Sequence, residues 1–322
     1  MHLFLEKALK NPAADGSRDT RFSRRTLFAG AAAAAGSATV SQAMARENLG
    51  TGHVRASEDG RVESRLLFFE DPLQHQQAAY RVLRNLHDEA DVLFWYHFTM
   101  FAVVLGARPE PVVRWEGIEF SHHRKLQHGV YRLHGHNLSF PRDLSHGKFI
   151  DTVMNPVTEK TVEVPPMALV EDPGYLNTLE GVISLDNPTA PPRTRLEQFL
   201  VEDDLIKVEQ IRLPPASWPA TFVETSVNWS PRDLFDDPGE LSLPAGTAGG
   251  YVFPWPAWMA MGDQEGHMFA TWHGRKLESI DQLPIDFLER AEKAHPELLA
   301  VDRTPFEQPL PPPLAGRFDG GS

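Results

Sequence analysis

Hydrophobic and polar positions alternate along most of the chain with the period of a β-strand. The longest apolar stretch, Val92 to Val104, carries β-branched and aromatic side chains at odd and even positions alike, which is typical of a central strand covered on both faces. Turn-forming pairs such as His128-Gly129 and Asn155-Pro156 separate shorter segments of the same character. Strands are predicted over residues 80–84, 92–104, 112–120, 130–140, 148–154, 161–164, 176–185, 199–201, 205–213, 221–227 and 267–273.

Helical periodicity is limited to two places. Residues 73–87 can begin as a short helix before the alternating residues 80–84, and a second helix is predicted to start at Asp281 or Leu283 and to end at His295-Pro296. The proline-rich residues 305–313 predict an extended tail. The expected fold class is mainly β, an antiparallel barrel or sandwich with few helices, one of them near the C-terminus. One β-rich domain is predicted over residues 64–300, followed by a tail over 301–322.

The first 45 residues carry the pattern of an export signal. The adjacent Arg24 and Arg25 precede a mildly apolar run from Leu27 to Val40, and Ala43-Met44-Ala45 offers a cleavage site. The run is about 14 residues long, too short to span a bilayer, which takes about 20. The sequence therefore predicts a twin-arginine signal over residues 1–45, a linker over 46–63, the twin-arginine export machinery as a partner, and a periplasmic protein without stable membrane insertion.

Composition narrows the chemistry. The 322 residues include no cysteine, which excludes disulfides, thiolate metal sites and a cysteine nucleophile. A hydrophobic share of 41% is enough for a large core. The formal net charge of −13 repels phosphate backbones, so nucleic acid is not an expected partner. No phosphate-binding glycine loop, serine nucleophile elbow or zincin motif is present.

Histidine is concentrated between residues 122 and 146. On a strand, alternate side chains share a face, so Arg132, His134 and His136 are expected to project together. His134 and His136 could hold a divalent metal with a carboxylate from a neighbouring strand, or could belong to a solvated basic face.

His97 lies in the most apolar predicted strand, beside Trp95 and Tyr96. A buried imidazole that stays neutral can act as a general base. The alternative is a core histidine with a hydrogen-bond partner and no role in chemistry. The aromatic neighbours favour a small-molecule cavity.

A second aromatic group covers residues 251–261. Prolines between Trp255 and Trp258 prevent a regular central strand there, so the segment is expected to be a stiff loop carrying large rings. It could cover the mouth of a barrel or fill one end of the core.

Several stretches together resemble an uncharacterised bacterial family described as domain of unknown function 1838. They are Tyr80-Arg81-Val82-Leu83-Arg84, Phe94-Trp95-Tyr96, Trp115-Glu116-Gly117, the segment 151–158, the segment 254–262, Gly274-Arg275-Lys276-Leu277 and Leu283-Pro284. The resemblance implies an exported, mostly β protein with a calycin-like barrel, and it carries no established catalytic residues. Glu159 stands where the family usually has glycine, and the proline-rich tail replaces an aromatic strand-like segment.

The leading hypothesis from the sequence is a periplasmic lyase, isomerase or cyclase that acts on a small apolar or aromatic molecule without an organic cofactor. His97, His134 or His136 would exchange protons, and Tyr96 or Arg132 would stabilise negative charge. The side chains expected to hold the substrate are Trp95, Trp115, Trp255, Trp258 and Met261. The alternatives are a lipocalin-like carrier with the same cavity, and a metal-dependent enzyme that uses His134 and His136.

Overall fold

The computed structural model describes residues 64–193, 196–212 and 223–318, all of which belong to one of the two compact units of the chain. The predicted export signal and linker, residues 1–63, lie outside the described residues. Export and periplasmic location therefore stay predictions. Within the described ranges, no helix combines the length and the apolar character that crossing a membrane requires.

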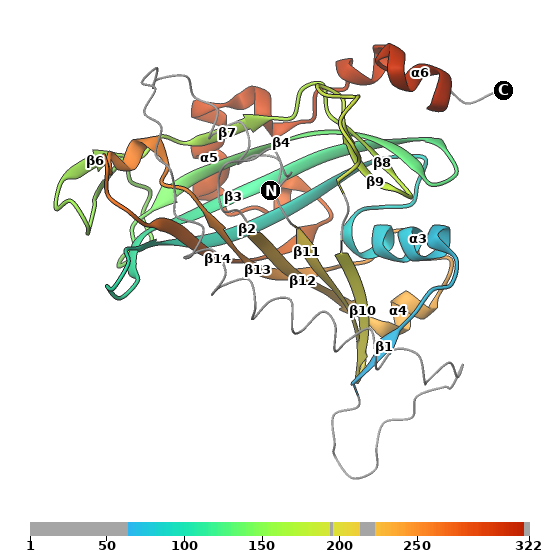
Figure 1. Ribbon diagram of the computed structural model, residues 1–322, viewed down its shortest axis with the longest axis horizontal. Coiled ribbons are helices and arrows are strands. Elements are labelled where there is room, and N and C mark those ends of the chain that lie inside the picture. Colours follow the sequence, from blue (N-terminus) through green and yellow to red (C-terminus); the bar gives the residue numbers. More distant parts are fainter. Residues whose placement is uncertain (1–63, 194–195, 213–222, 319–322) are drawn as a thin grey trace, which may run out of the picture. The chain divides into compact units, whose positions relative to one another are not determined.

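The described residues form one large antiparallel sheet (Figure 1). Its twelve strands are β1 (Ser64–Leu67), β2 (Glu89–Val103), β3 (Glu110–Gln127), β4 (Val130–Arg142), β7 (Met167–Val170), β8 (Tyr175–Thr178), β9 (Gly181–Ser184), β10 (Leu196–Glu202), β11 (Leu205–Arg212), β12 (Val223–Pro231), β13 (Gly246–Phe253) and β14 (His267–Leu277). Eleven of them follow the order β1-β10-β11-β12-β13-β14-β2-β3-β4-β8-β9, and β7 pairs with β4. Strands β5 (Thr152–Met154) and β6 (Thr161–Glu163) form a separate hairpin.

The prediction of a mainly β, antiparallel fold with a helix near the C-terminus is confirmed. The sheet stays open, because within the described residues its two end strands, β1 and β9, do not pair with each other. The longest strands, β2 and β3, lie in the middle of the order, as the two-sided apolar pattern of residues 92–104 predicted.

The described residues contain four helices, α3 (Pro72–Leu83), α4 (Arg232–Asp236), α5 (Ile285–Ala294) and α6 (Pro312–Phe318). They also contain the 3₁₀ turns η1 (Ala257–Met259), η2 (Ile280–Gln282), η3 (Pro296–Leu299) and η4 (Thr304–Glu307). The predicted strand over residues 80–84 is wrong, because this segment belongs to α3 and its end. Asp71 caps that helix by accepting a hydrogen bond from the Leu73 amide, and Pro72 occupies its first turn. The capped start lets Ala78, Ala79 and Val82 share one buried face.

The prediction of an extended tail is also wrong. Residues 304–307 and 312–318 are helical, and Leu310, Leu314 and Phe318 pack against β8 and β9 through Leu176 and Ile183. Because Leu310, Leu314 and Phe318 are apolar, packing them on the sheet removes apolar surface from water.

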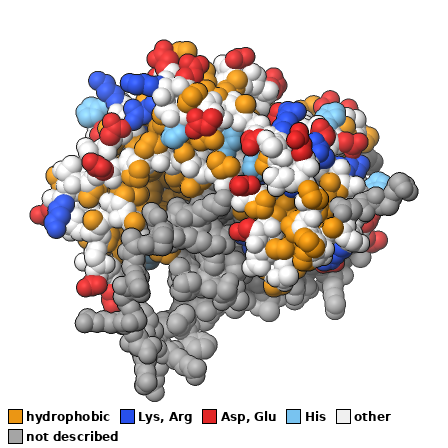
Figure 2. All heavy atoms as spheres, turned by 90° about the horizontal axis from the view of Figure 1, so that it is seen from above, with side chains coloured by type: hydrophobic (Ala, Val, Ile, Leu, Met, Phe, Trp, Pro, Cys, Tyr) orange, Lys and Arg blue, Asp and Glu red, His pale blue; other side chains and the backbone are white. Residues whose placement is uncertain are grey.

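The two faces of the sheet have different coverings. We call the face that carries Tyr96 and Trp115 the inner face; helix α3 packs on this side, against β10 and β11. The other, outer face packs against α5, whose Phe287 is fully buried among Ile118 and Phe140. Figure 2 shows acidic and basic side chains interspersed over one side of the described residues.

Helix α3 is held firmly over the inner face. The Arg81 guanidinium donates hydrogen bonds to the carbonyl oxygens of Leu234, Phe235 and Glu240 at 3.0, 2.7 and 2.6 Å. At the end of α3, Lys276 of β14 donates to the carbonyl oxygen of Arg84. The helix and the inner face of the sheet therefore enclose a fixed space.

Candidate binding cavity

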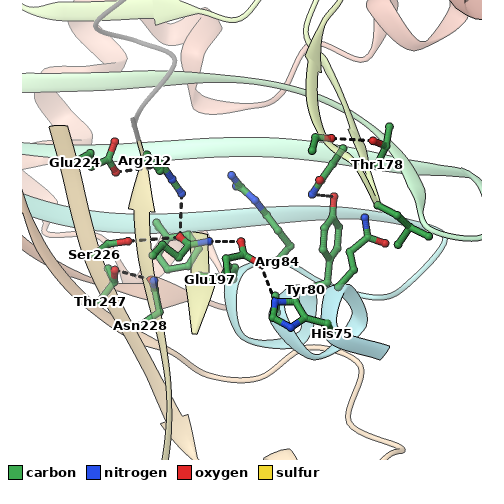
Figure 3. Close-up of a pocket in the computed structure, with 18 of the residues that line it drawn as sticks. His75, Tyr80, Arg84, Thr178, Glu197, Arg212, Glu224, Ser226, Asn228 and Thr247 are labelled. Carbon is green, nitrogen blue, oxygen red and sulfur yellow. Dashed lines mark hydrogen bonds and ion pairs between the residues drawn. The ribbon is translucent and has the colours of Figure 1, made fainter. Parts of the chain in front are cut away.

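A cavity of about 390 Å³ lies between α3 and the inner face of the sheet (Figure 3). Its walls come from α3, from the β8–β9 turn and from β2, β3 and β10 to β14. The strands on its two sides are far apart in the sheet order, so the curvature of the sheet brings them to one space. Its volume falls near the lower end of the range of small-molecule sites.

One wall of the cavity is aromatic, and its two largest rings lie directly over glycine residues of the neighbouring strands. Tyr96 lies over Gly117, where an added Cβ would come within 2.5 Å of the Tyr96 hydroxyl. Trp272 lies over Gly249 in the same way, with its ring 2.8 Å from the position of an added Cβ. Phe94 completes this wall. Because the glycines leave the backbone bare, both large rings can lie along the sheet and still leave the cavity open.

The adjoining wall is polar and comes from β11, β12 and β13. Arg212 pairs with Glu224 at 3.1 Å and donates to Gln210 Oε1 at 3.1 Å. Thr247 donates to Asn228 Oδ1 at 2.6 Å. Figure 3 shows Arg212, Glu224, Asn228 and Thr247 on these strands, across from α3. Their mutual hydrogen bonds fix their orientation before any ligand binds.

Helix α3 supplies the third wall. Arg84 pairs with Glu119 at 3.2 Å and donates to Ser121 at 2.9 Å. His75 lies 3.5 Å from Glu197, and the Tyr80 hydroxyl accepts a hydrogen bond from Asn177 at 2.8 Å. The carboxylates that line the cavity therefore face cationic or hydrogen-bonding partners.

Of the sequence-predicted catalytic residues, Tyr96 lines this cavity. Its hydroxyl donates to Asn137 Oδ1 at 2.5 Å, and burial raises the pKa of Tyr96 above its usual range. The phenol is therefore protonated at neutral pH and acts as a hydrogen-bond donor.

His97 lies on the outer face, away from the cavity. Its ring is 4.7 Å from the Trp95 ring and 5.5 Å from that of His273, which is exposed. Burial, together with the charges of His273, Arg114 and Arg142, lowers the pKa of His97 to about 4. The imidazole is neutral, as expected for a general base, but Trp95 points to Glu116, to which its indole donates at 2.9 Å. The structure does not bring His97 and Trp95 together with Tyr96.

Arg132, His134 and His136 are alternate residues of β4 and project from the outer face together, as the strand spacing predicted. They are buried beneath the C-terminal segment: His136 donates to the Leu298 carbonyl at 2.7 Å, Arg132 donates to the Gln308 carbonyl at 2.6 Å, and His134 packs near Phe306. Burial lowers the pKa values of His134 and His136. Across the described ranges, no three His, Asp or Glu side chains are grouped so that they could hold a metal ion.

The remaining predicted substrate-binding residues belong to one hydrophobic cluster. Trp115 and Met261 are buried there, and Trp255 and Trp258 pack against its edge. The aromatic segment therefore fills one end of the core beside the cavity, which is one of the two roles that the sequence allowed for it.

Most of the cavity residues did not stand out in the sequence. Glu224, Ser226 and Asn228 alternate along β12 with Val223, Thr225 and Val227, a pattern that is typical of a strand with one solvated face. The polar face here is buried, since these three side chains are 2–4% exposed. This alternation predicts a polar face on β12, but it does not distinguish a face exposed to bulk solvent from one that lines an enclosed cavity.

The glycine beneath Tyr96 gives a direct test of this wall. Gly117→Ala is expected to lower the free energy of unfolding by about 1–3 kcal/mol, because the new Cβ displaces the Tyr96 phenol or the Ser139 side chain. Urea unfolding measures the change. Gly316→Ala in α6 is the control, since its Cβ would meet nothing within 4 Å; equal stability of both variants would contradict the close packing at Gly117.

No protein-family model matches the chain, and no curated protein matches it. Membership of the bacterial family that the short motifs resemble stays a prediction.

Proposed function

We propose that this protein binds a small molecule in the cavity beneath α3 and acts as a carrier. The cavity itself is the observation that supports the proposal. It has a volume of about 390 Å³ and is lined by polar and aromatic side chains from strands that are far apart in the sheet order. A cavity lined by aromatic side chains and a few fixed polar groups is typical of a small-molecule site.

The positions of the three histidines expected from the sequence to exchange protons favour a carrier over an enzyme that uses them. Catalysis by His97, His134 or His136 would require the reacting molecule within hydrogen-bond reach of these rings. All three lie on the outer face, two of them buried under the C-terminal segment. The side chains nearest the cavity are instead engaged with one another, which suits binding and orientation. If the export signal acts as predicted, the carrier would work in the periplasm.

A substitution that fills the cavity tests the proposal. Ser226→Phe would place a ring beside Trp272 on the inner face, and we expect it to abolish ligand binding with the fold retained. Thr225→Phe is the matched control, because Thr225 is the exposed neighbour on the same strand and faces the other way. Native mass spectrometry of protein purified from its own host measures co-purified ligand in both variants.

The expected result is a small-molecule adduct on the unmodified protein and on Thr225→Phe, and none on Ser226→Phe. Thermal unfolding should show the same ranking, since a ligand that binds the folded state stabilises it. An adduct that persists in folded Ser226→Phe would place the ligand elsewhere and overturn the proposal.

A further inference from the structure

We propose that the ligand is a neutral ring compound with hydroxyl or carbonyl oxygens around its rim, as in a pyranose sugar. This inference rests on the proposed binding function and concerns the chemistry of the same cavity. Three observations carry it: the partners of the cavity carboxylates, the aromatic side chains of one wall, and the hydroxyl and amide groups beside them.

Each carboxylate that lines the cavity already has a partner, an arginine for three of them and Gln210 for Glu197. Glu119 pairs with Arg84 at 3.2 Å and Glu224 pairs with Arg212 at 3.1 Å. Glu197 accepts from Gln210 at 2.6 Å, and Glu180, at the rim, pairs with Arg317 at 2.8 Å. An anionic ligand would have to displace a carboxylate from Arg84 or Arg212, and a cationic ligand would have to displace Gln210 from Glu197. A ligand charge that stayed unpaired away from water would also be unfavourable. A neutral ligand leaves every pair intact.

The aromatic wall offers a flat surface. Trp272 is half-buried: one side of its ring lies over the bare backbone of Gly249, and the residue borders the cavity. Tyr96, over Gly117 on the neighbouring strand, also borders the cavity. The face of an aromatic ring carries partial negative charge and attracts C–H groups. A saturated ring with axial C–H groups on one face fits such a platform.

The polar wall offers hydrogen bonds at the rim of that surface. Gln210, Ser226, Asn228 and Thr247 all border the cavity beside Trp272. Their hydroxyl and amide groups can exchange hydrogen bonds with hydroxyl or carbonyl oxygens of a ligand. A lipid chain or a plain aromatic hydrocarbon offers no such oxygens.

The experiment compares matched neutral and charged sugars on the full chain. The probes are the methyl glycosides of glucose, galactose, mannose and xylose, with the corresponding uronates and amino sugars where they exist, and indole and 2-naphthol as apolar probes. Dissociation constants come from calorimetry and from tryptophan fluorescence. Trp272→Ala tests the platform, and Trp258→Ala, outside the cavity lining, is its control.

We expect at least one neutral glycoside to bind at least about tenfold more tightly than its charged counterparts. Trp272→Ala should lose that binding, and Trp258→Ala should retain it. A uronate or amino sugar that binds as tightly as its neutral counterpart, or Trp272-dependent binding of the apolar probes alone, would overturn the ligand class and leave the carrier function standing. If no probe binds and no ligand co-purifies with the protein, both proposals fail.

Discussion

Replacing Trp115 by alanine is expected to lower the free energy of unfolding by about 3–5 kcal/mol, the usual cost of truncating a large buried aromatic side chain. Trp115 is 1% exposed and stacks on Phe98 with ring centroids 5.7 Å apart. It packs in the cluster that closes one end of the inner face. Truncation would leave a void that its neighbours in the middle of two long strands cannot fill. Urea unfolding monitored by circular dichroism measures the loss.

Two further variants make the Trp115 result specific. Trp258→Ala should cost clearly less, because Trp258 is only partly buried at the edge of the same cluster. Trp115→Phe should recover much of the loss, since it keeps a ring and removes an indole N–H that has no hydrogen-bond partner within the described part of the chain. If Trp115→Ala is as stable as the unmodified protein, Trp115 is not a core residue, and the role in ligand binding expected from the sequence would regain support.

Stability is expected to fall as the pH falls from about 6.5 to about 4. His123 is fully buried with its ring edge-on to the stacked rings of Tyr80 and Tyr131. Burial, with the nearby charges of Arg84, His122 and Lys276, lowers its pKa from 6.5 to about 4. The folded state therefore holds this imidazole neutral. The unfolded chain takes up a proton at a higher pH, so protonation favours unfolding over this window.

The size of the effect follows from the shift. The change in the His123 pKa from 6.5 to about 4 corresponds to about 3 kcal/mol of stability that is present above pH 6.5 and lost by about pH 4. The lowered pKa values of His97, His134 and His136 act in the same direction. Urea unfolding at pH 7 and pH 4.5 measures the difference.

The matched variants for the pH dependence are His123→Leu and His128→Gln. His123→Leu removes one titrating group and should reduce the slope of the pH dependence by the share of His123, even if it changes the stability at pH 7 by losing the hydrogen bond to the His87 carbonyl. His128 is exposed, so its replacement should leave the pH dependence unchanged. An unchanged slope in His123→Leu would show that His123 does not carry the effect.

Local patterns were sufficient where neighbouring residues decide the structure. The alternation and the turn pairs predicted most strands, and Pro284 with the apolar stripe after it predicted α5. The spacing of Arg132, His134 and His136 predicted a shared face. Residues 80–84 alternate as a strand would, but the Asp71-Pro72 cap, also a local signal, starts a helix that continues through Leu83.

The residues that line the cavity could not be predicted from local patterns. His97 and Tyr96 are adjacent in β2, yet they face opposite sides of the sheet, and Tyr96 is the one that borders the cavity. The partners of Tyr96 there, Trp272 of β14 and Arg84 at the end of α3, are distant in the sequence. Nothing in the local pattern connects them.

The sequence by itself determined the class of fold, the alternation of side chains between two faces, and an acidic chain without cysteine chemistry. Only the tertiary structure decided which face is enclosed and therefore which polar residues are available to a ligand. The reason is physical: alternation is set within each strand by the backbone, whereas enclosure depends on how a curved sheet brings distant strands beneath a helix that is anchored elsewhere.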